Sequence, residues 1–247
     1  MEIALVTGGS KGIGLYTVLG LVNSGYKVIT CSRSQATWLE AIKTYSDLKS
    51  VDYLQADLSK EDELKRLFEY IKTEYGRLDV AVNNASPQIA SLGNFHEIDD
   101  ALLKGTLDID FWAQAQCLKC ELNLMQEGAS IVNVSSINGL RPTPSASMYS
   151  ASKHALEGLT RSLALENIKR GIRVNSVAPG VTWTPRWEET ALTNPNVRSE
   201  VSEVVPLKRF GHIHEVVNAI EFLLSSKASY IVGHTLVVDG GLSLRGG

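Results

Sequence analysis

The chain has 247 residues, of which 44% are hydrophobic and 21% charged, a composition that supports a sizeable core and excludes a disordered or collagen-like protein. With 24 basic and 27 acidic residues its net charge is −3, and neither sign forms a block that would attract nucleic acid or anionic lipid. Since no apolar run approaches the ~18 residues of a membrane helix and the chain opens on an apolar strand, we expect a cytoplasmic protein with a small-molecule partner.

Short apolar runs alternate with amphipathic stretches of helical period, which is typical of a parallel sheet covered by helices on both faces. The predicted strands are Glu2–Thr7, Lys27–Cys31, Asp52–Ala56, Leu78–Val82, Ser130–Ser135, Arg173–Ala178 and Thr235–Val238. The predicted helices lie near 13–24, 35–45, 60–75, 100–126, 148–169 and 212–225. The pattern predicts a doubly wound α/β fold of the Rossmann type, in which seven parallel strands form the middle of three αβα layers in a single domain, 1–247.

One long stretch, 182–210, fits neither pattern and carries two Trp and three Pro residues. Because the other connections are short, we interpret it as a lid or a substrate-binding loop. A surface excursion with a short helix is the alternative.

A glycine-rich turn follows the first strand and opens the first helix. Its residues are Thr7-Gly8-Gly9-Ser10-Lys11-Gly12-Ile13-Gly14. Glycines permit close backbone approach to a pyrophosphate, which the free N–H groups and dipole of a helix N-terminus attract. We therefore expect the dinucleotide contacts to come from Gly8, Ser10, Lys11, Gly12, Ile13 and Gly14.

The second strand ends in Cys31-Ser32-Arg33, without the acid that an NAD enzyme would be expected to place against the ribose hydroxyls. Arg33, Ser32 and Lys11 instead offer positive charge and donors suited to a 2′-phosphate. The sequence thus favours NADP(H) over NAD(H), with two unliganded surface cations as the alternative.

Two further motifs carry a family resemblance. Asn83-Asn84-Ala85-Ser86 follows the fourth strand, and Ser136 precedes a Tyr149-x-x-x-Lys153 pair after the fifth. Nearly end to end, the chain resembles the short-chain dehydrogenase/reductase family; further matches are Asp57-Leu58, Asn175, Pro179-Gly180 and Asp239-Gly240-Gly241. The resemblance implies an oxidoreductase that moves a hydride between nicotinamide and a carbonyl or alcohol. It further implies that the protein is a ketoreductase and that it forms a homotetramer or homodimer.

Tyr149 and Lys153 stand four residues apart on a predicted helix and so share one face. The ammonium favours the phenolate, which would make Tyr149 a usable general acid or base. By the resemblance, Ser136 polarises the substrate oxygen and Lys153 also binds the nicotinamide ribose. A surface Tyr–Lys pair is the alternative, and a nucleophilic serine is disfavoured because no G-x-S-x-G elbow is present.

The resemblance also assigns further cofactor contacts. Asp57 and Leu58 would meet the adenine, Asn84 and Ala85 the ribose side, and Pro179, Gly180, Thr182 and Thr184 the nicotinamide. Asp57 and Thr184 could instead be caps. Five scattered histidines predict no catalytic metal, and Cys117-x-x-Cys120 is interpreted as structural packing rather than a redox or zinc motif.

Three residues depart from the family. Asp110, in Asp108-Ile109-Asp110, replaces the usual Asn, Ser86 replaces a glycine, and Thr182 stands where an aliphatic residue often packs against the nicotinamide. A carboxylate close to Lys153 would weaken its field, so we hypothesise that Asp110 lowers the efficiency of proton transfer. This charge is the sole support for an alternative function, a cofactor-binding sensor or scaffold with little turnover.

Substrate contacts are expected around the end of the sheet and from the long stretch. They are Pro87, Gln88, Ile89, the segment 137–142, Met148, Trp183 and Trp187. Arg141 and Arg186 could meet an anionic group or be solvated.

Overall fold

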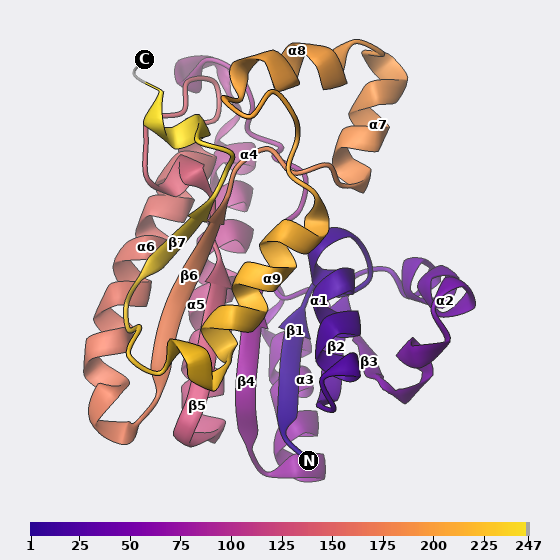
Figure 1. The fold of residues 1–247 in the computed structure, drawn as a ribbon, viewed down its shortest axis with the longest axis vertical. Helices are drawn as coiled ribbons and strands as arrows, with labels where there is room; N and C mark the ends of the chain where they lie inside the picture. Colours follow the sequence, from indigo (N-terminus) through magenta and orange to yellow (C-terminus); the bar gives the residue numbers. More distant parts are fainter. Residues whose placement is uncertain (246–247) are drawn as a thin grey trace.

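The computed structural model describes residues 1–245, and seven parallel strands form one sheet at its centre (Figure 1). The strand order is β3-β2-β1-β4-β5-β6-β7, so the chain winds outward in both directions from β1 and β4. The strands are β1 (Ile3–Thr7), β2 (Lys27–Ser32), β3 (Asp52–Gln55), β4 (Leu78–Asn83), β5 (Met125–Val134), β6 (Arg173–Pro179) and β7 (Thr235–Val238). The predicted doubly wound sheet is confirmed.

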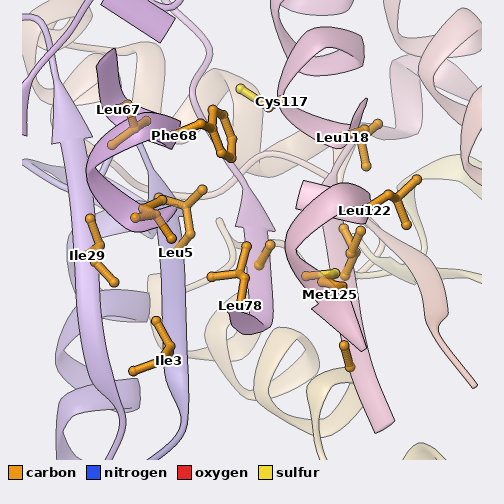
Figure 2. Close-up of a cluster of buried hydrophobic side chains, with 14 of the residues drawn as sticks. Ile3, Leu5, Ile29, Leu67, Phe68, Leu78, Cys117, Leu118, Leu122 and Met125 are labelled. Carbon is orange, nitrogen blue, oxygen red and sulfur yellow. The ribbon is translucent and has the colours of Figure 1, made fainter. Parts of the chain in front are cut away.

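Helices cover both faces of the sheet and create two separate cores. The helices are α1 (Gly12–Asn23), α2 (Gln35–Thr44), α3 (Glu61–Tyr75), α4 (Asp100–Leu107), α5 (Ala113–Leu124), α6 (Ser147–Asn167), α7 (Pro185–Thr193), α8 (Val197–Val204) and α9 (Ile213–Leu224). Both faces of strand β1 are covered, which explains why its residues are largely apolar. Leu5 packs with α3 and α5 on one face (Figure 2). Val6 packs with α1 and α9 on the other. Among residues 1–245, no helix has the length and hydrophobicity needed to cross a membrane.

The helix predicted over 100–126 is interrupted and shorter. It consists of α4, a π-helical turn over Asp108–Trp112, and α5, which ends at Leu124. Met125 already belongs to β5, where it pairs with Leu78 and is buried, so burial and strand pairing end the helix two residues early. The π-helical turn contains Asp110, which it leaves buried.

The segment 182–210 contains two short helices, α7 and α8, beyond the carboxyl end of the sheet (Figure 1). Its two ends meet, because Trp183 N–H donates to the carbonyl of Gly211 at 2.9 Å. Trp183 and Trp187 both pack edge-on against Phe210, with ring centroids 5.1 Å apart in each case. The segment is therefore an ordered, aromatic-centred unit above the strand ends.

Candidate active site

A cavity of about 510 Å³ lies at the carboxyl edge of the sheet, where parallel strands of this fold bring their functional side chains together. Most of the predicted site residues line it: Gly8, Ser10, Lys11, Gly12, Ile13, Ser32, Arg33, Asp57, Leu58, Asn84, Ala85, Ser136, Tyr149, Lys153, Pro179, Gly180, Thr182 and Thr184. Gly14 and Asp110 do not. The cavity thus gathers residues from between Gly8 and Glu189, far apart in the sequence.

Tyr149 and Lys153 lie on one face of α6 at the wall of this cavity, and the Lys153 ammonium is 5.7 Å from the centre of the Tyr149 ring. Lys153 is only 1% exposed, and its Nζ donates to the carbonyl of Val134 at 3.2 Å. Helix α6 approaches the end of β5 closely because Gly139 has no side chain: a Cβ there would lie 2.9 Å from the backbone of Lys153.

Ser136 follows β5 and faces the same cavity. The backbone N–H of Asn138 donates to Ser136 Oγ at 3.1 Å, which orients the hydroxyl and leaves its proton available for another acceptor. Ser136, Tyr149 and Lys153 thus bring two hydroxyl groups and an ammonium, all hydrogen-bond donors, to one cavity.

Asp110 lies behind the cavity, 1% exposed, with Oδ1 3.9 Å from Lys153 Nζ. The same oxygen accepts a hydrogen bond from Ser86 Oγ at 2.6 Å. Two of the three residues that depart from the family pattern, Ser86 and Asp110, are thus in direct contact. Sequence reasoning identified each one but gave no sign that they touch.

The glycine turn is held against β4 by Asn84, whose Nδ2 donates to the carbonyls of Thr7 and Gly8 at 3.0 and 3.2 Å. A Cβ on Gly14 would lie 2.3 Å from the Gly8 carbonyl oxygen, so this glycine is required for packing within the turn. Gly12, at φ +60°, begins α1, and a Cβ there would make ordinary contacts, 3.8 Å from Pro185 and 4.0 Å from Thr184.

The first turn of α1 has no acidic residue, and Lys11 at its N-cap makes no side-chain capping bond. Backbone N–H groups of this helix end are therefore available to an anion at the cavity wall. A glycine turn, a helix N-terminus and nearby cations make a donor set that fits the diphosphate of a dinucleotide.

Beyond the glycine turn, Ser32 and Arg33 line the cavity together with Ser34 and Thr37 at the start of α2. Sequence reasoning missed Ser34 and Thr37, although a serine that precedes a helix is a recognisable N-cap signal; Thr37 N–H donates to Ser34 Oγ at 3.2 Å. Lys11, which also lines the cavity, forms an exposed ion pair with another lining residue: its Nζ lies 3.5 Å from Glu189 Oε1 on α7.

Asp57 and Thr184, for which the sequence left a cofactor contact and a cap open, both line the cavity and both stand in a connection that precedes a helix. Asp57 lines the cavity and also accepts bonds from the backbone and hydroxyl of Ser59, at 3.1 and 2.7 Å. Thr184 lines the cavity and occupies the N-cap position of α7 without a side-chain capping bond.

Only some of the residues expected to contact substrate line the cavity. Pro87, Gln88, Arg186 and Trp187 line the cavity, and the missed residue Gln114 joins them from α5. The remaining expected contacts lie outside its lining: Ile89, the segment 137–142, Met148 and Trp183.

Physical reasons for these differences are visible in the packing. Ile137 is buried in a small apolar cluster with Val205 and Leu242, and Trp183 packs on Phe210 beneath the guanidinium of Arg198. Arg141 donates to the carbonyl of Leu242 at 3.3 Å, whereas Arg186 donates to that of Pro87 at 2.7 Å.

The Cys117-x-x-Cys120 motif lies outside the lining of the cavity. Cys117 and Cys120 are free, and burial raises the pKa of the Cys117 thiol well above its ordinary value, as expected for structural packing. Among residues 1–245, no three His, Cys, Asp or Glu side chains gather around a common point suited to a metal ion.

A doubly wound parallel sheet, a glycine turn at its first crossover and a Tyr–Lys pair at its carboxyl edge together define a dinucleotide-dependent type of oxidoreductase. Comparisons with known proteins agree with this class. Residues 8–243 match the family described as enoyl-(acyl carrier protein) reductase.

The chain is 37% identical to carbonyl reductase family member 4 of Xenopus laevis over 246 residues, which covers 99% of each protein. It is 35% identical to the short chain dehydrogenase/reductase astE of Aspergillus oryzae over 254 residues, covering 98% of this chain and 95% of astE. The solved structure of ElxO with NADP bound superposes with a TM-score of 0.92 at 30% identity, covering 99% of each chain. The chain belongs to the short-chain dehydrogenase/reductase family and is an oxidoreductase of that family.

Proposed function

We propose that this protein is an NADP(H)-dependent ketoreductase that interconverts a carbonyl compound and its alcohol. In this role NADP(H) supplies or accepts the hydride at the cavity. Tyr149 transfers the proton to or from the substrate oxygen, Ser136 donates a hydrogen bond to that oxygen, and Lys153 favours the phenolate and holds the nicotinamide ribose.

The observation that carries this proposal is the buried ammonium of Lys153, 5.7 Å from the Tyr149 ring, beside a cavity that also holds Ser136. A cation in a poorly solvated wall acts more strongly on a neighbouring phenol than one in water. The carbonyl reductase among the relatives supports a carbonyl substrate.

Preference for the phosphorylated cofactor is supported by the chemistry around Arg33. Its guanidinium can bind a phosphate with two parallel hydrogen bonds, and Ser32, Ser34 and Thr37 add hydroxyl donors on the same side of the cavity. The NADP-bound ElxO structure is consistent with this choice.

We further propose that the protein forms a homotetramer or homodimer in the cytosol. Leu165 on α6 is 76% exposed and Trp112, just before α5, is 56% exposed, and a groove lies between these two helices. A second copy that covered these side chains would remove apolar surface from water.

The first test is turnover of NADPH with a panel of ketones by the parent protein and by Tyr149→Phe. We expect the variant to keep NADPH binding, measured by cofactor fluorescence, and to lose about 10²- to 10⁴-fold in kcat because the proton donor is gone. Ser152→Ala on the same helix is a matched control, since Ser152 is buried but bonds only to the carbonyl of Met148. If the parent binds NADPH and reduces none of the ketones, the sensor or scaffold function is favoured instead.

The second test concerns cofactor choice. Replacing Arg33 with Ala should raise the NADPH dissociation constant about ten- to hundredfold, as expected for a lost charged hydrogen bond, and leave that for NADH nearly unchanged. Arg77→Ala, just before β4 on the opposite edge of the sheet, controls for net charge. An equal loss for both cofactors would contradict the assignment of Arg33 to the 2′-phosphate.

A further inference from the structure

We propose that Ser86 is a positioning residue that acts through Asp110: its hydroxyl holds the Asp110 carboxylate and so keeps that carboxylate from drawing Lys153 away from Tyr149. The inference rests on the proposed function, because it explains how this chain keeps the Tyr149–Lys153 pair in place despite an added negative charge.

Two distances to the same oxygen atom, Oδ1 of Asp110, support this inference. Asp110 Oδ1 accepts the Ser86 hydroxyl at 2.6 Å and lies 3.9 Å from Lys153 Nζ. A distance of 2.6 Å is that of a charge-assisted O–H···O⁻ bond, whereas 3.9 Å is too long for a direct hydrogen bond to the ammonium. The carboxylate is therefore bonded to the hydroxyl and only faces the cation.

Lys153 has a competing bond of its own, from Nζ to the carbonyl of Val134 at 3.2 Å. This bond keeps the ammonium at the end of β5, next to the cavity. Two buried opposite charges at such a separation attract strongly, since both side chains are 1% exposed and little water screens them. The observed position of Lys153 is thus a balance between Val134 and Asp110, and Ser86 weakens the pull of Asp110.

The Ser86 backbone is fixed on two sides, which sets the position of its hydroxyl. Gln114 Nε2 donates to the carbonyl of the preceding residue, Ala85, at 3.2 Å. From α7, Arg186 Nη2 lies 3.4 Å from the carbonyl oxygen of Ser86 itself. The charged or titratable groups around this cluster are Asp110 on the π-helical turn, Lys153 and Tyr149 on α6, and Arg186 on α7.

Removal of the hydroxyl should change the balance. In Ser86→Gly the carboxylate loses a donor, so the ammonium can close from 3.9 Å to a direct bond of about 2.8 Å. That movement of about 1 Å takes Lys153 away from Val134 and Tyr149, and displacements of this size can cost about 10²-fold in rate. In Asp110→Asn the charge is absent, and the same serine substitution should have little effect.

A double-mutant cycle with Ser86→Gly, Asp110→Asn and the combined variant tests this dependence. We expect Ser86→Gly to lower kcat at least about tenfold in the parent and less than about threefold in the Asp110→Asn background, with KM for the ketone changed less than about threefold in each. Ser86→Thr, which keeps a hydroxyl, should retain kcat within about threefold of the parent. Equal losses from Ser86→Gly in the two backgrounds would overturn the proposal.

The pH dependence of alcohol oxidation separates positioning from a merely structural role. Because a directly paired Lys153 has less field to offer the phenol, the midpoint of the pH–rate profile should rise by about one pH unit in Ser86→Gly and stay in place in the double variant. Loss of rate with an unmoved midpoint would count against the proposal.

A measurement without substrate or cofactor keeps the two proposals apart. In ¹⁵N-lysine-labelled protein, with the Lys153 signal assigned by its absence in Lys153→Met, Ser86→Gly should shift that signal only where Asp110 is retained. If the parent reduces no ketone, the ketoreductase proposal fails, while a shifted signal still supports the contact proposed here. An unshifted signal overturns it whatever the activity of the parent.

Discussion

Two buried carboxylates on one helical stretch, Asp110 and Glu121, have opposite surroundings. They are eleven residues apart, about three turns, and so lie on the same face. Asp110 is 1% exposed and has Lys153 and Ser86 beside it. Glu121 is fully buried, and its single protein donor within the described residues is Asn83 Nδ2, at 3.0 Å. Burial raises the pKa of Glu121 to about 8.

The comparison shows that the charge of the neighbouring groups, more than burial, distinguishes the two acids. Asp110 lies beside the ammonium that α6 brings to the cavity wall. Glu121 instead contacts Asn83, the last residue of β4, whose amide also bonds to Asn133 in a network of neutral groups. Near a buried cation the charged form of an acid is stabilised, whereas among neutral amides the protonated form is favoured.

The largest effect is expected when the cation beside Asp110, Lys153, is removed. Lys153→Met leaves Asp110 buried without its charged partner, and we expect the free energy of unfolding to fall by about 3–5 kcal/mol at about pH 8. The loss should be smaller at about pH 5, where the stranded carboxyl can bind a proton. Urea unfolding of the cofactor-free protein at the two pH values measures both effects.

Two further variants separate the effect of the buried charge from that of packing and of net charge. Lys153→Met with Asp110→Asn should recover much of the lost stability, because no unpaired charge is left in the interior. Lys65→Met removes the cation of an exposed ion pair with Glu61 and should change the unfolding midpoint little. If the double variant were no more stable than Lys153→Met, the loss would reflect packing of the lysine stem rather than the charge.

The same contrast shows what a sequence can predict about this molecule. Strand β1 is predictable because alternate residues face two apolar layers, so that Leu5 and Val6 are both buried. The Tyr149–Lys153 pair is predictable because helical spacing fixes a shared face. Both inferences need only local geometry.

Contacts between segments that are distant in the sequence could not be predicted from local geometry. Ser86 and Asp110 are 24 residues apart, on a loop after β4 and on a π-helical turn, and the path between them follows from tertiary packing. Ile137 follows the predicted catalytic serine directly yet points into an apolar cluster rather than toward the cavity. The helix predicted to reach residue 126 ends early because Met125 pairs with Leu78, a partner 47 residues away.

Replacement of Glu121, the acid among neutral groups, tests the other half of the comparison. Because the folded pKa of Glu121 is about 8 and its ordinary value is 4.5, the folded protein holds a proton that the unfolded chain releases between these values. The stabilising contribution is thus present at low pH and is lost as pH rises from about 4.5 to about 8. Glu121→Gln has no such loss, so relative to the parent it should gain on the order of 2–4 kcal/mol between about pH 5 and about pH 9.

Glutamine is a suitable replacement because its amide resembles the protonated carboxyl in carrying both a donor and an acceptor. In the structure Glu121 Oε1 and Asn83 Oδ1 both lack a described partner, and a neutral donor at position 121 suits such a site better than a carboxylate. Glu166→Gln, on the exposed side of α6, removes the same charge without burial and controls for net charge. Parent and Glu121→Gln curves that stayed parallel over this pH range would mean that the interior tolerates this charge without a cation, and the distinction between the two acids would fail.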